Sequence, residues 1–260
     1  MVSDCDAASW PGVPQAFRDS NEQLPAPWQE IFGPLRQGIR DDLVVVGQFG
    51  QSIDARIATP TGHSHYINGA AGLAHLHRLR ALVDAVVIGI GTALNDDPQL
   101  TVRHVAGPSP ARVVIDPSGR LPASARLFAA DGIRRLVITR AETQTGLPAG
   151  TEHVPLPAPR GQLAPEAILA ALAARGFRRI LIEGGADTVS RFLAAGCLDR
   201  LHVVIAPIIL GAGRSSVTLA PIARVEEAMR APMRIHRLGE EVLLDCDLGA
   251  QRIVVAKKST

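Results

Sequence analysis

Short runs of β-branched and aliphatic residues recur along this 260-residue chain, and their spacing constrains its fold more than any other feature. Runs this short, with turn residues at their ends, are typical of strands that are buried on both faces of a sheet. They lie at residues 43–49, 84–90, 112–116, 135–139, 179–183 and 200–206, with a shorter candidate at 152–155. Helical patterning occupies residues 69–82, 165–175 and 186–195. Strands that alternate with helices predict an α/β fold with a mostly parallel sheet and helices on both faces.

Both ends of the chain depart from this alternation. Runs at residues 233–238, 242–247 and 252–256 are joined by connections too short for helices, so we expect antiparallel strands and a mixed sheet. At the other end, prolines punctuate residues 1–40, which predicts an extended arm with one helical turn near 28–35. Its Trp10 and Trp28 either dock on the main body or on another subunit, or the arm is only partly ordered. We therefore divide the chain into an arm, 1–40, and a main domain, 41–260.

Composition excludes several classes of protein. The 27 basic and 25 acidic residues leave a net charge of +2, so we expect no general binding of nucleic acid. No apolar run approaches the roughly 20 residues that span a bilayer, and we expect no membrane association. Three widely spaced cysteines and the lack of a visible export signal predict a cytoplasmic setting. His63, His65, His75 and His77 fall close together, but the last two diverge on a predicted helix, so we expect no metal.

Candidate ligand contacts follow the predicted strands, because open α/β sheets bind ligands at the carboxyl ends of their strands. Glu183-Gly184-Gly185 lies between a strand and a helix, which suits either a phosphate-binding loop or a tight turn with an exposed glutamate. The segment beginning at Gly89 lacks the third glycine of a dinucleotide fingerprint, and an ordinary Rossmann domain is therefore not expected. Arg80 and Arg103 suit either an anion clamp or a solvated surface. The helix that contains Arg80 has Asn68 as its predicted N-cap.

Four segments together resemble one family, the reductase domain of riboflavin biosynthesis, which in bacteria is commonly the C-terminal half of a bifunctional deaminase–reductase. They are residues 52–67, 79–103, 112–122 and 179–211, in the order that the family has them. The resemblance implies a three-layer, dihydrofolate-reductase-like α/β fold, a homodimer and NADPH as cofactor. It also implies reduction of the ribosyl group of a pyrimidine ribosylamine 5′-phosphate to a ribityl group, by hydride transfer to C1′ of an imine. A separate deaminase is then expected in the pathway, because the deaminase half has no counterpart here.

The resemblance also implies roles for individual residues, carried over by motif position. The implied substrate contacts are Ser64, Arg80, Leu100, Arg103 and Glu183. The implied cofactor contacts are Tyr66, Thr92, Asp96, Pro117, Ser118, Arg120, Gly184, Gly185, Ala186, Asp187 and Thr188. Asp54 and Glu183 are the two candidates for the catalytic proton donor, and the sequence does not separate them.

Two residues depart from the family's pattern. Ala55 replaces the usual glycine of the first motif, which is a strained choice if that position needs a positive φ. Tyr66 stands where a tryptophan often packs against the cofactor. Two alternative functions therefore remain open at this point: a dihydrofolate- or pterin-type reductase, and a non-catalytic nucleotide-binding protein.

Overall fold

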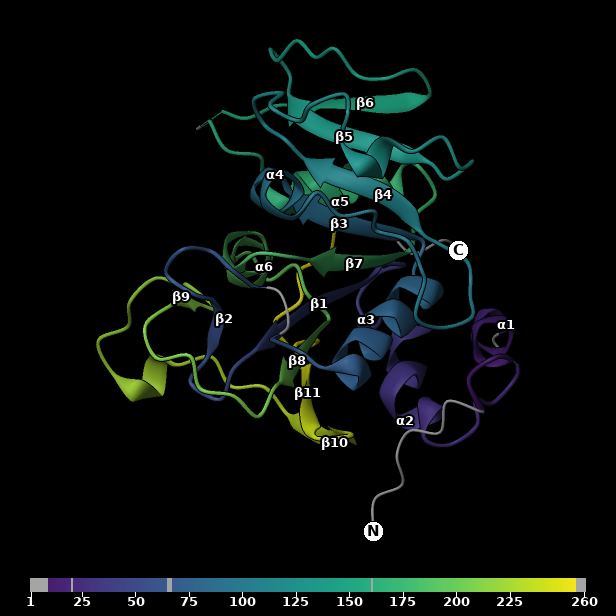
Figure 1. Cartoon of the computed structure of the whole chain (residues 1–260), viewed down its shortest axis with the longest axis vertical. Coiled ribbons are helices and arrows are strands. Elements are labelled where there is room, and N and C mark those ends of the chain that lie inside the picture. The colour runs from purple at the N-terminus through teal and green to yellow at the C-terminus, as the bar shows by residue number, and fades with distance from the viewer. Residues whose placement is uncertain (1–8, 20, 65–66, 160, 256–260) are drawn as a thin grey trace.

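A computed structural model gives the arrangement of the chain and describes residues 9–19, 21–64, 67–159 and 161–255 (Figure 1). The strands are β1 (Val44–Gln51), β2 (Arg56–Ala58), β3 (Ala85–Gly89), β4 (Ala111–Ile115), β5 (Arg135–Arg140), β6 (Thr151–Leu156), β7 (Arg179–Glu183), β8 (Arg200–Ile205), β9 (Arg214–Ser215), β10 (Met233–Leu238) and β11 (Glu241–Asp247). The α-helices are α1 (Val13–Arg18), α2 (Trp28–Phe32), α3 (Ala70–Leu82), α4 (Ile90–Asp96), α5 (Pro165–Ala173) and α6 (Ala186–Ala194). Short 3-10 turns cover Gly33–Leu35, Arg126–Phe128 and Val225–Glu227.

Nine of these strands form one sheet in the order β10-β11-β8-β1-β7-β3-β4-β5-β6. From β8 to β6 the neighbouring strands are parallel, whereas β11 pairs antiparallel with β8 and β10 antiparallel with β11. The predicted mixed, mostly parallel sheet is therefore confirmed. β2 and β9 form a separate two-stranded ribbon.

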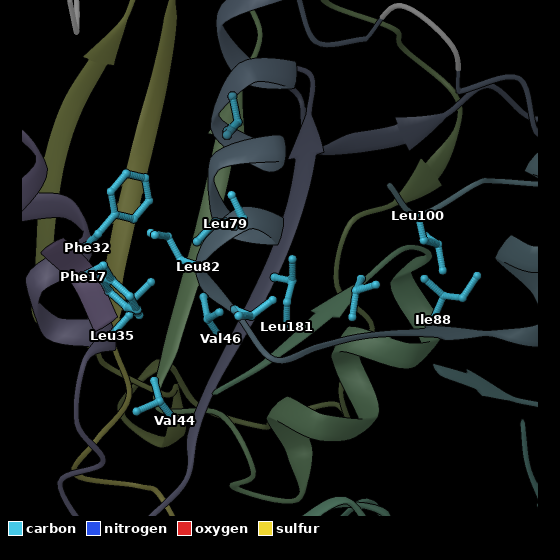
Figure 2. Packing of buried hydrophobic residues seen from close by; sticks show 14 of the residues in the cluster. Phe17, Phe32, Leu35, Val44, Val46, Leu79, Leu82, Ile88, Leu100 and Leu181 are labelled. Atoms are coloured by element: carbon cyan, nitrogen blue, oxygen red, sulfur yellow. The ribbon is translucent and has the colours of Figure 1, made fainter. Parts of the chain in front are cut away.

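The two faces of the sheet carry two separate hydrophobic clusters. Along β1, Val44 and Val46 belong to one cluster while Val45 belongs to the other, as the two-residue period of a strand requires. The first cluster is covered by α3 together with α1 and α2 (Figure 1), and the second by α5 and α6. Figure 2 shows the first cluster, in which Leu79 and Leu82 of α3 lie over the valines of β1. None of the helices within the described ranges has the length and apolar content needed to cross a bilayer.

The described part of the arm, called the N-terminal segment from here on, contributes directly to the first cluster. Trp10 and Trp28 are 2% and 0% exposed, and their rings meet edge to face at 5.3 Å. The guanidinium of Arg78, on α3, lies 4.5 Å from the centre of the Trp28 ring, a cation–π contact. Both tryptophans thus dock on the main body of the same chain. The expected extended arm is wrong in one respect, because α1 as well as α2 is helical. The division of the chain at residue 40 stays a prediction.

Two further expectations are corrected by contacts between distant parts of the chain. Asn68 does not cap α3; it donates to Glu241 of β11, and the carboxylate of Glu241 accepts the backbone N–H groups of Gly69 and Gly72 instead. Residues 252–255 form no strand. Side chains hold them in place, since the Nε of Arg252 donates to Asp199 at 3.1 Å and Asp41 accepts the N–H of Val255 at 2.7 Å.

Candidate active site

A cavity of about 860 Å³ opens at the carboxyl ends of β3, β4 and β7. The cavity is lined by Gly89 and Ile115, the last residues of β3 and β4, and by Gly185, which follows β7. It therefore lies at the edge of the sheet where the sequence predicts the ligand contacts. Its volume lies within the range of small-molecule and cofactor sites. Eight residues predicted to contact the cofactor line it: Thr92, Pro117, Ser118, Arg120, Gly185, Ala186, Asp187 and Thr188.

Two other predicted cofactor residues do not line the cavity, and the structure does not describe a third. Gly184 is not part of the lining but supports it from the turn that precedes α6. Asp96 is exposed at the last position of α4 and does not line the cavity, whereas its neighbour Asn95 does. Tyr66 lies outside the described residues, so its predicted contact is untested.

The turn between β7 and α6 is built around glycine. Gly184 has a φ of +104°, and a Cβ there would lie 2.7 Å from the hydroxyl oxygen of Thr92. That hydroxyl accepts the N–H of Gly185 at 3.0 Å, which ties the turn to α4. The first turn of α6 then presents its N-terminal end to the cavity through Ala186 and Asp187. A helix N-terminus offers free N–H groups and a positive dipole end to an anion, so the turn suits a phosphate.

Several lining residues escaped the sequence interpretation. Arg191 and Ser190 of α6 follow Asp187 at helical spacing, a signal that sequence periodicity contains. Five residues between 214 and 220 also line the cavity, where the β2–β9 pairing brings them: Arg214, Ser215, Thr218, Leu219 and Ala220. No local pattern indicates that pairing. Arg120, Arg191 and Arg214 together outnumber the single acid of the lining, Asp187, so the cavity is positively charged.

Asp54 holds a loop beside this ribbon. Its carboxylate accepts hydrogen bonds from the hydroxyl of Ser52 at 2.6 Å and from the backbone N–H groups of Leu210 and Gly211 at 3.0 and 2.7 Å. The bonds from Ser52 and Leu210 are the main causes that lower the pKa of Asp54 to about 2. Next to it, Ala55 has a φ of +58°, so this position needs the left-handed conformation that a glycine adopts without strain.

Arg80 and Glu183 form a buried ion pair. The Nε and Nη2 of Arg80 donate to the two carboxylate oxygens of Glu183 at 2.7 and 2.6 Å, and Nη1 donates to the carbonyl of Thr101 at 3.1 Å. Each side chain is 7% exposed. Burial alone disfavours the charged guanidinium, but the carboxylate of Glu183 outweighs it and raises the pKa of Arg80 above its ordinary value. The two residues, predicted as separate substrate contacts, therefore bind each other.

Arg103 is the more accessible of the two predicted clamp arginines. Its Nη1 donates to the hydroxyl of Thr101 at 2.8 Å, and its backbone N–H donates to Nδ1 of His77 at 2.9 Å. Partial burial, together with repulsion from Arg80 and Arg126, lowers the pKa of Arg103. Since Glu183 balances the charge of Arg80, the positive potential that an anion would relieve comes from Arg103 and Arg126.

Leu100 and Ser64 complete the predicted substrate contacts. The side chain of Leu100 is buried in the first cluster, with a φ of +55°, so only its backbone is available to a ligand (Figure 2). Ser64 is partly exposed in the loop before α3 and does not line the cavity. Of the histidines considered for a metal, His75 instead contacts His202 at 3.0 Å and His77 holds Arg103.

Comparison with known proteins agrees with this geometry. A family model described as the RibD C-terminal domain matches residues 44–244. The 2,5-diamino-6-ribosylamino-4(3H)-pyrimidinone 5′-phosphate reductase of Methanothermobacter thermautotrophicus is 33% identical over 219 residues, 77% of this chain and 96% of that protein. Riboflavin biosynthesis protein RibD of Aquifex aeolicus is 32% identical over 199 residues, 76% of this chain and 55% of that protein.

A solved structure shares the fold as well. The diaminohydroxyphosphoribosylaminopyrimidine deaminase/5-amino-6-(5-phosphoribosylamino)uracil reductase of Thermotoga maritima superposes with a TM-score of 0.69 at 27% identity, over 79% of this chain and 56% of that one. The chain thus spans about half the length of the Aquifex and Thermotoga proteins and nearly all of the archaeal reductase. The predicted dihydrofolate-reductase-like fold is confirmed by this likeness and by the mixed sheet. Since the family model covers most of the chain, the protein belongs to the RibD C-terminal domain family.

Proposed function

We propose that this protein is an NADPH-dependent reductase that converts the ribosyl group of a pyrimidine ribosylamine 5′-phosphate into a ribityl group. The substrate is 5-amino-6-(5-phosphoribosylamino)uracil or its 2,5-diamino precursor. The observation that carries the proposal is the cavity at the carboxyl ends of β3, β4 and β7, in a chain of the RibD C-terminal domain family. Relatives named as reductases of such a phosphate support it.

The residues of the cavity fit NADPH as cofactor. The glycine turn at Gly184 leaves no space for a side chain, so that backbone N–H groups and the N-terminus of α6 can approach a pyrophosphate. Arg120 and Arg214, which both line the cavity, would hold the 2′-phosphate that distinguishes NADPH from NADH. Once bound, NADPH supplies the hydride that reduces C1′ of the ring-opened sugar. The protein aligns the two reactants and excludes water from them.

The substrate phosphate is proposed to bind at Arg103. This side chain is largely exposed. Its partial burial and its arginine neighbours lower its pKa, so a phosphate next to it would be favoured. Glu183 balances the charge of Arg80, so Arg80 supports this site by holding the backbone of Thr101, whose hydroxyl accepts a hydrogen bond from Arg103.

The imine nitrogen needs a proton, and the two candidate donors differ. With a pKa of about 2, Asp54 carries almost no proton at neutral pH, and its carboxylate already accepts three hydrogen bonds. We therefore assign Asp54 a positioning role in the loop beside the β2–β9 ribbon. Glu183 is the remaining candidate for proton transfer, and substrate binding would have to loosen its ion pair with Arg80.

A substrate panel tests the function. Purified protein is expected to oxidise NADPH, followed by absorbance, with the deaminated aminouracil phosphate or its diamino precursor. Arg103→Ala is expected to raise the substrate KM roughly tenfold with a smaller change in kcat, if the phosphate contact contributes equally to ground and transition states. Arg134→Ala, which removes an exposed arginine that pairs with Glu152, is the control. Turnover of dihydrofolate alone, or of no candidate, would contradict the proposal.

We further propose a homodimer that works beside a separate deaminase in a reducing, cytoplasmic setting. Large apolar side chains are open to solvent along the segment that follows β9 and on the outer strand β10: Ile222, Val225, Met229, Met233 and Ile235. A second copy that packs on these residues would remove them from water. Cys197 and Cys246 are free thiols, in keeping with a reducing setting. Sedimentation of wild type and of Val225→Asp/Ile235→Asp, expected to be a monomer, tests the dimer.

A further inference from the structure

A second pocket lies at the opposite end of the sheet, between the N-terminal segment and the main body. It has a volume of about 440 Å³ and is bounded by Phe17, Gly33 and Pro34 on the side of the segment. On the side of the body it is bounded by the first residues of β7 and β8, Arg179 and Arg200. The five residues of β7 separate it from the glycine turn by roughly 16 Å, at about 3.3 Å per residue.

Arginine dominates the lining of this pocket. Five arginines, Arg18, Arg36, Arg179, Arg200 and Arg234, face one carboxylate, that of Asp247. Arg200 is neutralised, because its Nε and Nη2 each donate to Asp245 at 2.7 Å and its Nη1 donates to Asp247 at 3.2 Å. The sole acid of the lining is therefore engaged by an arginine that already has a partner.

The other four arginines keep much of their charge unbalanced. Arg18, Arg36 and Arg234 have no acidic partner within the described ranges of the chain. Arg36 donates only to carbonyl oxygens at the end of α1 and just beyond it, and Arg234 donates to a carbonyl of α2 at 3.5 Å.

Arg179 is the most constrained of the four. Its guanidinium lies 5.3 Å from the centre of the Phe17 ring and makes one long contact with Asp84, 3.7 Å between Nη1 and Oδ1, while its buried Nε has no hydrogen-bond partner. A buried donor without a partner is costly, and a ligand that accepts a hydrogen bond would remove that cost.

We propose that this pocket binds a small anion that contains a phosphate group. Guanidinium groups recognise phosphate oxygens through paired, charge-assisted hydrogen bonds, and an excess of arginine in a concave site attracts anions. Arg18 and Arg36 come from the N-terminal segment and Arg179 and Arg234 from the body, so a bound anion bridges the two. Since the family match covers residues 44–244, eight of the eleven lining residues of this pocket lie outside the matched region.

The test is calorimetric titration of the full chain with inorganic pyrophosphate at constant ionic strength. The decisive variant is Arg18→Ala/Arg234→Ala, because both side chains are exposed and the fold is expected to tolerate their loss. The matched control is Arg120→Ala/Arg214→Ala, which removes the same charge from the cofactor cavity.

We expect saturable binding to the wild type, at least roughly tenfold weaker binding to the pocket variant, and retention of this binding in the cavity control. Both tryptophans of the chain lie in the N-terminal segment, so their fluorescence reports on that segment during the titration. Wild-type protein that shows no saturable binding would overturn the proposal. The proposal would also be overturned if the cavity control lost pyrophosphate binding while the pocket variant kept it. Because NADPH oxidation is measured separately, failure here leaves the proposed reductase function untouched.

Discussion

The buried pair of Arg80 and Glu183 yields a quantitative prediction about stability. Two short hydrogen bonds join side chains that are each 7% exposed, so neither charge has appreciable contact with water. Removing one partner leaves the other buried and uncompensated, which typically costs about 3–5 kcal/mol, whereas replacing both with apolar side chains is often close to neutral. We therefore expect Arg80→Met and Glu183→Leu each to lose about 3–5 kcal/mol of unfolding free energy, and the double variant to lose far less than the sum.

Urea denaturation of the wild type, the two single variants and the double variant measures this coupling, provided that the m-value stays constant. The exposed pair Arg224–Glu227, 79% and 44% exposed, is the control and is expected to couple by less than about 1 kcal/mol when changed to alanine. Single variants that each cost under about 1 kcal/mol, or a double variant that equals their sum, would refute the reasoning. Such a result would mean that Glu183 is held loosely enough to act on a substrate without first leaving Arg80.

Two further predictions concern the glycine turn and His77. Gly184 has a φ of +104° and lies against Thr92, so Gly184→Ala is expected to lower the free energy of unfolding by about 1–3 kcal/mol and to raise the KM for NADPH. Gly146 has open space around it, and Gly146→Ala is expected to change neither quantity. Urea denaturation measures the first effect and steady-state kinetics the second. Burial, followed by the charge of Arg80, lowers the pKa of His77 to about 3 in the folded protein. As the pH drops from about 6.5 toward 3, His77 therefore takes up a proton in the unfolded chain but not in the folded one, and the free energy of unfolding falls. Between pH 7 and pH 5 His77 accounts for about 2 kcal/mol of this loss, and His77→Gln is expected to lose correspondingly less; an equal loss in both proteins would contradict the assignment.

The sequence predicts the central strands and their carboxyl-end contacts well, because both depend on local patterns. The run at 179–183 has three apolar residues at its centre and is followed by two glycines, and the structure has a buried strand and a glycine turn there. Ala55 is a related case: the motif's usual glycine raises the question of whether this position needs a positive φ, and the backbone there has one. Such features are determined within a few residues of the chain.

Features made by distant segments could not be predicted in the same way. Glu241 supplies the cap of α3 from the far end of the chain, so Asn68 is not needed in that role. Arg80 and Glu183 are 103 residues apart, and only the packing of α3 against β7 reveals that each is the other's partner. The wall of the cavity from residue 214 onward likewise depends on the β2–β9 pairing.

The packing of the N-terminal segment has a practical consequence for work on this protein. Trp10, Phe17, Trp28 and Phe32 fill the cluster beneath α3, yet all four precede residue 44, where the match to the family begins. A protein trimmed to the family boundary would present that apolar face of α3 to water, and aggregation during expression is the expected result. Anyone who isolates this protein as a minimal domain would thus remove part of its own core.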